Sequence, residues 1–322
     1  MADELPAVPR NGTQVTLRVA TPVGPISVVG EIVEADPEHW SVRRRDGSVA
    51  KVAVASIEAR REMPPGRSAT ATPTEVQQLA AFGWRALETV RLGDWLLRAS
   101  GGFTRRSNSA MAVGDAGVPL ERALDLVTDW YAERGLPPTV SQADGASPPQ
   151  LPAYLSDRGW QLGAVSHVMT GEVAHALQGM PNAVAGAVAG GLELVAADAP
   201  DEAWYACYSQ GAHAPGEVGR RVIENHPAAS YLSLRDGERA VAVARASVDA
   251  RWAGLFAVAV APDRRREGLG AAVTLGALKD AARRGARHVY LQVEVGNAAA
   301  IELYRRLNLR VHHDYRYWSS PK

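Results

Sequence analysis

The segment from residue 258 to residue 271 constrains the fold of this chain more than any other. It reads as a β-strand that stops at Pro262, a basic turn, and two glycines that open a helix: Val258-Ala-Val-Ala-Pro-Asp-Arg-Arg-Arg-Glu-Gly-Leu-Gly-Ala271. Glycines let backbone N–H groups approach an anion, a helix N-terminus carries partial positive charge, and arginines add counter-charge. The helix would also have a buried face, formed by Leu269, Ala272, Val273 and Gly276. The segment therefore predicts a strand, turn and helix that cradle a pyrophosphate.

Two other phosphate-binding loops do not fit this segment. A Walker loop needs Gly-Lys-Ser/Thr after its first glycine, and a dinucleotide-binding fold needs a third glycine and an acidic residue on the next strand tip. Neither pattern is present. A glycine pair at a helix start is also ordinary turn chemistry, so the surrounding elements have to support the interpretation.

The elements around this segment alternate between strands and helices. The pattern predicts strands at residues 192–196, 231–234, 240–248, 255–260 and 289–295, and helices at residues 201–209, 216–224 and 268–284. Asn297 is placed to cap a further helix through Leu307. This order favours an α/β fold with a mixed sheet.

The first 73 residues have a different character. Short strands are expected at residues 13–19, 26–33, 40–43 and 49–54, separated by proline, glycine and aspartate, which suggests a small five-stranded barrel. Residues 63–73 collect loop formers and are expected to be a linker.

The middle of the chain repeats the order of elements found near its end. Helices are expected at residues 74–85, with Thr74 as the N-cap, and at residues 119–134, with a strand at residues 95–98. Residues 179–191 are mostly Gly, Ala and Val, which suggests a linker or packed turn. A shift of 150 residues places three sites of the middle part onto the later part without gaps: Arg134-Gly135 onto Arg284-Gly285, Gln142 onto Gln292, and Tyr154 onto Tyr304. The repeat suggests duplication, and only the second copy keeps the glycine pair.

Two motifs resemble those of the GNAT superfamily of acyl-CoA-dependent N-acetyltransferases. They are Arg265-x-x-Gly268-x-Gly270 and Leu291-x-Val293-x-x-x-Asn297-x-x-Ala300-x-x-Leu303-Tyr304, in the family's order and spacing. The resemblance is strong over residues 192–322. Residues 73–178, including the stretch 93–108, look like a degenerate first half seen in actinobacterial members with an N-terminal SH3-like barrel. The resemblance thus implies tandem GNAT-like halves behind a small all-β SH3-like barrel.

The resemblance also implies where acetyl-CoA would bind. Backbone groups of Val258 and Val260 would pair with the pantetheine arm, and an N–H group near Val258 would polarise the thioester carbonyl. N–H groups of the glycine turn would hold the pyrophosphate. The implied cofactor-binding residues are Val258, Ala259, Val260, Arg265, Arg266, Glu267, Gly268, Leu269, Gly270, Ala271, Asn297, Ala300 and Tyr304.

Catalytic groups follow less directly. Tyr304 matches the family's usual general acid, which protonates the departing thiolate. Some members place a glutamate twelve residues before this tyrosine, and here that position is Gln292, which cannot take a proton. Glu294, two residues on, is the candidate base on the same strand face. The remaining alternatives are a water relay, or one of Glu217, Glu224 and His226.

Composition limits the other classes of function. The chain has 35 basic and 35 acidic residues and a single cysteine, Cys207, so neither a disulfide framework nor a global attraction to nucleic acid is expected. No stretch of about 18 apolar residues occurs, which predicts no membrane span. The adjacent His312 and His313 are expected to point to opposite faces of a last strand and to hold no metal, and the arginines at 43–45 to form a solvated turn.

The sequence thus predicts a cytoplasmic N-acetyltransferase that moves an acetyl group from acetyl-CoA to an amine acceptor, without a metal. The expected domains are an SH3-like barrel at 1–63, a linker at 64–73, a degenerate half at 74–182 and a catalytic domain at 189–322. The barrel would bind a protein partner, position an acceptor or mediate self-association. Two alternatives remain: a CoA-responsive regulatory protein without catalysis, and a nucleic-acid adaptor that acts through the barrel.

Overall fold

Two separate β-sheets organise the chain, one of five strands and one of eleven. The computed structural model describes residues 8–9, 14–21, 26–43, 48–62, 71–211 and 214–321. The five-stranded sheet belongs to a compact unit of residues 1–71, and the larger sheet belongs to a second unit of residues 72–322. The two units are described one after the other.

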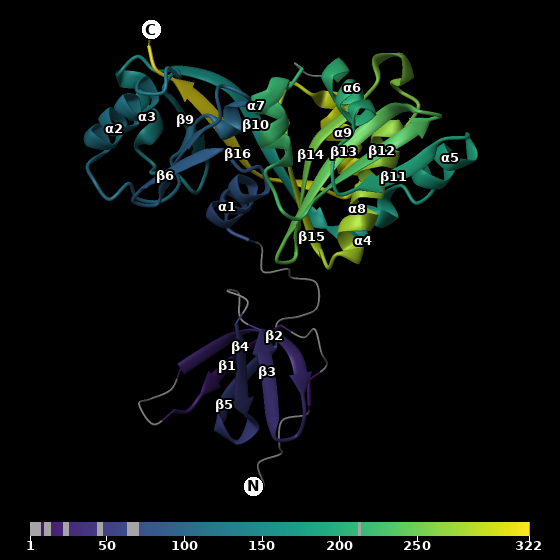
Figure 1. The fold of residues 1–322 in the computed structure, drawn as a ribbon. Helices are drawn as coiled ribbons and strands as arrows, with labels where there is room; N and C mark the ends of the chain where they lie inside the picture. Colours follow the sequence, from purple (N-terminus) through teal and green to yellow (C-terminus); the bar gives the residue numbers. More distant parts are fainter. Residues whose placement is uncertain are drawn as a thin grey trace. The chain divides into compact units, whose positions relative to one another are not determined.

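The first unit is an antiparallel sheet in the order β4-β3-β2-β1-β5 (Figure 1). Its strands are β1 (Gln14–Val19), β2 (Ile26–Ala35), β3 (His39–Arg43), β4 (Val49–Ala53) and β5 (Ile57–Glu62). Alternate residues share a face, which lets Val15, Leu17, Ile32 and Trp40 form a buried cluster. The strands match the predicted all-β unit in number, and closure into an SH3-like barrel stays a prediction. Arg44, Arg45 and residues 63–70 of the predicted linker lie outside the described residues.

The second unit contains eleven strands and nine α-helices among its described residues. The strands are β6 (Glu88–Leu92), β7 (Trp95–Ala99), β8 (Ala110–Met111), β9 (Thr139–Ala143), β10 (Gln161–Glu172), β11 (Glu193–Ala197), β12 (Ala229–Asp236), β13 (Arg239–Asp249), β14 (Trp252–Val260), β15 (His288–Glu294) and β16 (Arg310–Ser319). The helices are α1 (Pro73–Gly83), α2 (Leu120–Ala132), α3 (Leu151–Asp157), α4 (Val173–Gly179), α5 (Ala183–Ala189), α6 (Glu202–Gly211), α7 (Gly216–Glu224), α8 (Leu269–Arg283) and α9 (Ala298–Arg306).

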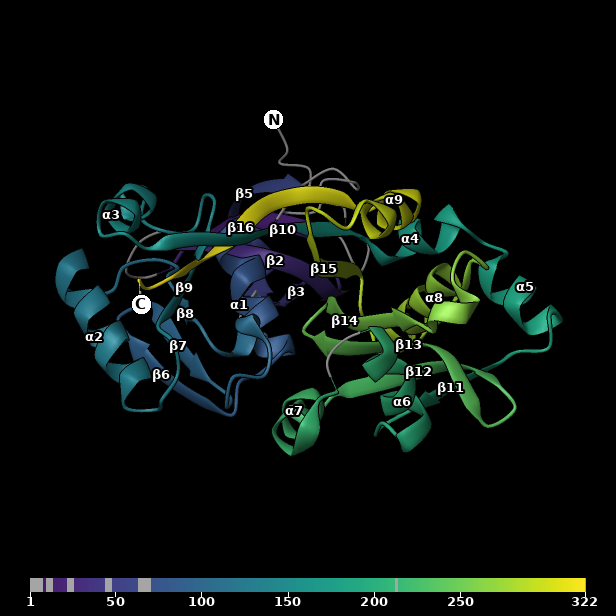
Figure 2. The ribbon, with the colours of Figure 1, turned by 90° about the horizontal axis from the view of Figure 1, so that it is seen from above.

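The sheet of this unit is mixed, in the order β11-β12-β13-β14-β15-β10-β16-β9-β8-β7-β6. Its two parallel contacts are β14 with β15 and β8 with β9. The long strands β10 and β16 lie side by side in its middle (Figure 2). β10 comes early in the chain yet pairs with β15, and β16 comes last yet pairs with β9. The early and late strands of the unit therefore interlock in one sheet.

Both faces of β13 are covered by helices. Ala242, Ala244 and Ala246 face a core that includes Leu269 and Val273 of α8. On the other face, the buried Arg245 donates hydrogen bonds to the carbonyls of Gly83 on α1 and Ile223 on α7, both at 2.8 Å. The strand that neighbours the functional site is thus fixed from both sides.

Two local expectations about helices are wrong. Thr72, not Thr74, is the N-cap of α1: its side chain accepts from the N–H of Glu75, whose carboxylate accepts from the N–H of Thr72. Proline at the first helical position then fixes where α1 begins. Residues 183–189 form helix α5 rather than a linker, because an alanine-rich run favours a helix and Val184 packs against the core.

The two adjacent histidines also differ from the expectation. Their Nδ1 atoms lie 2.8 Å apart, so the side chains meet. The register of β10 and β16 shifts between Val168↔His313 and Met169↔Val311, which makes His312 the extra residue of a bulge and turns it from its regular face. Gln77 of α1 hydrogen-bonds the other ring nitrogen of His313 at 2.9 Å. Among the described residues, no group of three or more His, Cys, Asp or Glu side chains is placed to hold a metal.

Candidate active site

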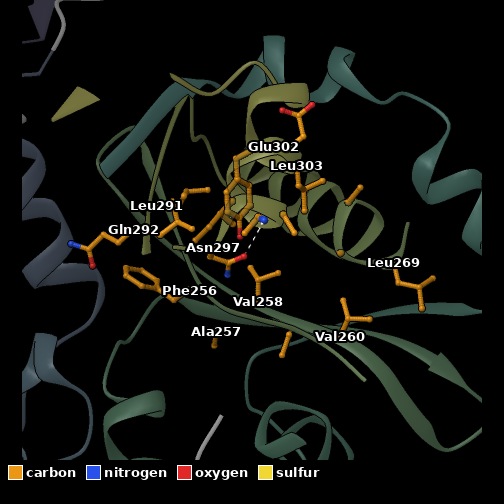
Figure 3. Close-up of a pocket in the computed structure, with 18 of the residues that line it drawn as sticks. Phe256, Ala257, Val258, Val260, Leu269, Leu291, Gln292, Asn297, Glu302 and Leu303 are labelled. Carbon is orange, nitrogen blue, oxygen red and sulfur yellow. Dashed lines mark hydrogen bonds between the residues drawn. The ribbon is translucent and has the colours of Figure 1, made fainter. Parts of the chain in front are cut away.

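Two parallel strands separate and open a cleft. β14 and β15 pair from Trp252↔His288 to Leu255↔Leu291 and no further. Beyond that point β14 continues along β13, whereas β15 continues along β10. The sheet therefore has a wedge-shaped opening that starts at Phe256 and Gln292 (Figure 3).

A β-bulge lies at the start of this opening. The register between β13 and β14 shifts between Val243↔Ala259 and Arg245↔Phe256, and Ala257 has a φ of 51°. A non-glycine residue in the left-handed region is uncommon and tends to occur at functional sites. A bulge leaves its extra residue outside the ladder of hydrogen bonds, so it turns the backbone next to Val258 toward new partners.

Helix α8 begins at the far end of the opening. Gly268 is its N-cap, with a φ of 79°, and Arg266 has a φ of 67°. Left-handed residues in a turn can direct successive N–H groups toward one point, which forms an anion-binding concavity. Gly270 leaves space between the helix and the cleft, since a Cβ there would lie 3.5 Å from Leu303 and 3.6 Å from Val260. The turn and the N-cap of α8 therefore have left-handed backbone at the place where the sequence predicts a pyrophosphate cradle, and the cradle itself stays a prediction.

Ion pairs hold the basic turn in place. The guanidinium of Arg264 contacts Glu267 at 2.9 Å and Asp236 at 3.0 Å. Glu267 is therefore engaged within the turn, and it does not line the cleft. Arg265 and Arg266 do line it.

Helix α9 forms the opposite wall. Asn297 caps this helix, since its Oδ1 accepts from the N–H of Ala300 at 3.1 Å (Figure 3). Tyr304, one turn further on, is 7% exposed, and burial raises the pKa of its phenol to about 12. The phenol is therefore protonated at neutral pH, and it holds its proton more tightly than an exposed tyrosine does.

Together these elements enclose a cavity of about 1030 Å³. Most of the predicted cofactor-binding residues line it: Val258, Ala259, Val260, Arg265, Arg266, Gly268, Leu269, Gly270, Ala271, Asn297, Ala300 and Tyr304. Gln292 lines it too, whereas Glu294 does not and is exposed. The cavity thus brings together the two motifs but not the candidate base.

The other candidate bases have different partners. Tyr205 donates to Glu224 at 2.5 Å, and His226 lies 3.1 Å from Asp249. Glu217 is an exposed residue of α7. None of Glu217, Glu224 and His226 lines the cavity.

Residues from outside the two motifs complete the cavity at the Phe256 end. They are Trp84, Thr104, Arg106 and Tyr208. The two motifs do not point to these four residues. The run of Gly, Thr, Arg and Asn at residues 101–108 indicates a loop but not that the loop reaches the cavity.

Comparison with known proteins finds relatives that match most of the chain. The family model described as "Probable histone acetyltransferase Rv0428c C-terminal" matches residues 70–318. The probable histone acetyltransferase Rv0428c of Mycobacterium tuberculosis is 30% identical over 325 aligned residues, which cover 96% of this chain and 95% of that protein. The uncharacterized N-acetyltransferase YobR of Bacillus subtilis is 26% identical over 250 residues, 76% of this chain and 96% of that protein.

Solved structures share the fold over most of the chain. A GCN5-related N-acetyltransferase from Kribbella flavida superposes with a TM-score of 0.60 at 19% identity, covering 78% of this chain and 96% of that one. A tandem GNAT protein from the clavulanic acid biosynthesis pathway superposes with a TM-score of 0.55 at 15% identity, covering 80% of this chain and 91% of that one. Because the family model matches residues 70–318 and the relatives are acetyltransferases, the chain belongs to the GNAT family and is an N-acetyltransferase.

Proposed function

We propose that this enzyme transfers an acetyl group from acetyl-CoA to an amine, with acetyl-CoA bound between β14 and β15. One observation carries the proposal: the two strands separate at a bulge, and the opening leads directly to the glycine-capped N-terminus of α8. GNAT acetyltransferases use acetyl-CoA, whose pyrophosphate and amide-rich arm suit such a site.

The cleft fits the two ends of this substrate. The edge of β14 from Val258 to Val260 faces the opening, so its backbone groups would pair with the pantetheine amides as an added strand does. The pyrophosphate would receive N–H groups between Arg266 and Ala271 and the partial positive charge of the helix. Arg265 and Arg266 would add counter-charge.

The chemistry is a direct transfer. The neutral amine attacks the thioester carbonyl carbon, and the carbonyl oxygen becomes an oxyanion that an N–H group beside Val258 would stabilise. The C–S bond then breaks, and the thiolate takes a proton. Tyr304 would supply this proton, since its buried phenol is protonated at neutral pH.

The proton of the attacking amine needs another route. Gln292 lines the cavity but cannot accept a proton, and Glu294 does not line the cavity. We therefore favour the water relay over Glu294, with the amine entering in its neutral form.

We also propose the predicted domain organisation: an SH3-like barrel at 1–63, a non-catalytic GNAT-like part at 74–182 and the catalytic part at 189–322. Support for a duplication comes from the 150-residue shift, which places α3 near α9, β9 onto β15 and β10 onto β16. The early part would contribute one wall of the acceptor site through Trp84, Thr104 and Arg106.

Calorimetric titration of acetyl-CoA into the whole chain tests the proposal. We expect one site per chain, lost in Gly270→Glu, where a carboxylate about 4 Å from the pyrophosphate costs up to about 4 kcal/mol. Gly186→Glu on α5 is the matched control, since a Cβ there meets nothing within 4 Å and the residue does not line the cavity. Absence of binding by the unmodified chain, or equal binding by Gly270→Glu, would overturn the proposal.

A further inference from the structure

The cavity has an end that the acetyl-CoA site does not use. It runs along β14 from Val260, beside α8, to Phe256, where the strands first separate. Figure 3 shows Leu269 and Val260 at one end and Phe256 and Gln292 at the other. An amine must reach the thioester near Val258 from the Phe256 end, because the pantetheine arm and the pyrophosphate would fill the rest.

Arg106 is the charged residue at that end. Its guanidinium carbon lies 5.3 Å from the ring centre of Trp84 and 5.9 Å from that of Phe256, which are distances of cation–π contacts. Within the described part of the chain, no carboxylate pairs with Arg106, and Glu302 is the one carboxylate that lines the cavity. Glu302 belongs to α9, accepts from Arg306 at 3.1 Å, and points away from Phe256 (Figure 3).

Further cations lie behind Arg106. The guanidinium of Arg245 packs against the same two rings, 5.2 Å from Trp84 and 5.4 Å from Phe256. Its hydrogen bonds go to backbone carbonyls, and Arg98 bonds to the carbonyl and hydroxyl of Ser109. Asp249, which pairs with His226 at 3.1 Å, is the one described carboxylate that acts on Arg245, and no described carboxylate pairs with Arg98 or Arg106. Positive charge therefore exceeds negative charge at the Phe256 end, which favours an anion.

The loop that carries Arg106 is held rigidly. The side chain of Asn108 accepts from the N–H groups of Ser100 and Gly102 and donates to the carbonyls of Phe103 and Thr104, all within 3.0 Å. Thr104 has a φ of 59°, which is strained for a β-branched residue, and its hydroxyl accepts from Trp84 at 3.2 Å. A guanidinium held in advance binds an anion without an ordering cost.

We propose that the acceptor is a small amine that carries a carboxylate, and that Arg106 binds this carboxylate; the inference rests on the proposed function. Such an acceptor would place its anionic group at the Phe256 end and its amine toward Val258. The arginine also repels an ammonium group, so it favours the neutral, nucleophilic form of the amine. Among the described residues, no carboxylate or histidine lines that end of the cavity to take a proton from the amine. A polyamine or a lysine side chain presents no carboxylate to this end.

Matched acceptors test the proposal. L-Phenylalanine and γ-aminobutyrate would each be compared with their carboxamides and with a lysine-containing histone-tail peptide, following CoA release to obtain kcat/KM. We expect the acids to be preferred. In Arg106→Gln we expect kcat/KM for the acids to fall about 10- to 100-fold, the range of a lost charge-assisted hydrogen bond, while that for the amides stays near the wild-type value.

Three controls make the result interpretable. Arg105→Gln removes a neighbouring charge that does not line the cavity and should leave both acceptor classes unchanged. Arg106→Lys keeps the charge and should retain part of the preference for acids. The KM for acetyl-CoA should not move in any of the three variants.

Equal use of acids and amides, preference for the lysine peptide, or an equal loss for both classes in Arg106→Gln would overturn the inference. If acetyl-CoA binds but no acid is acetylated, the inference is wrong while the cofactor site stands. If acetyl-CoA does not bind at all, the proposed function itself has failed.

Discussion

The two glycines at the start of α8 should respond oppositely to the same change, Gly→Ala. Gly268 has a φ of 79°, and a Cβ there meets nothing within 4 Å. Gly270 lies in the first turn of the helix, and a Cβ there would touch Leu303 and Val260 at ordinary contact distances of 3.5 and 3.6 Å. One position is therefore limited by backbone conformation and the other by space in the cleft.

The expected magnitudes follow from these differences. Alanine in the left-handed region costs about 1–2 kcal/mol, so Gly268→Ala should lower the free energy of unfolding by that amount. Alanine in a helix is favoured over glycine by up to about 1 kcal/mol, so Gly270→Ala should not destabilise the fold. The added methyl group narrows the pyrophosphate cradle, and overpacking of about 1–3 kcal/mol would weaken acetyl-CoA binding about 5- to 150-fold.

Thermal unfolding and calorimetric titration of both variants measure the two effects separately. Gly268→Ala should melt earlier, whereas Gly270→Ala should melt at or above the wild-type temperature and bind acetyl-CoA more weakly. Wild-type affinity in Gly270→Ala, or a larger loss of stability in Gly270→Ala than in Gly268→Ala, would refute the assignment of this turn as the cradle.

Three further substitutions probe the site and its support. Tyr304→Phe should lower kcat about 100-fold without changing acetyl-CoA affinity; an unchanged kcat would exclude Tyr304 as the acid. Burial lowers the pKa of His313 from 6.5 to about 4, so the unfolded chain binds the proton first. The free energy of unfolding of the wild type should therefore fall by up to about 3 kcal/mol as the pH falls from 6.5 to 4, and that of His313→Gln should fall less. Denaturant titrations over this pH range that give the same loss for both proteins would contradict this prediction. Arg245→Met should lower the free energy of unfolding by about 2–4 kcal/mol, because it leaves the buried carbonyls of Gly83 and Ile223 without a donor. An unchanged midpoint of denaturant unfolding would show that those hydrogen bonds contribute nothing.

The strand, turn and helix around the glycine pair could be read from the sequence because each boundary has a local cause. Pro262 stops β14, glycine at position 268 adopts a conformation that other residues avoid, and Asn297 caps α9 with its own side chain. The order of strands and helices after residue 192 followed from the same kind of signal.

Other features of the site have no local signal. Alanine has no preference for a φ of 51°, so the bulge at Ala257 results from the pairing of β13 and β14. Arg106 lies at the cavity because the early part of the unit packs against β14. The spacing of residues 101–108 does not predict this packing. Strand alternation alone points to position 294, and alternation does not tell where the cleft wall ends.

The interlocked strands β10 and β16 affect how the protein folds during synthesis. β9 lacks its neighbour on one edge until residues 310–319 have been made, and β10 likewise waits for both β15 and β16. The common route, in which an N-terminal domain completes folding while the next is translated, is therefore closed to residues 72–322. β6 to β9 can pair with one another early, but β10 and one edge of β9 remain unpaired on the ribosome for most of translation. An unpaired strand edge can pair with the wrong chain, so this stretch is exposed to aggregation until residues 310–319 have been made.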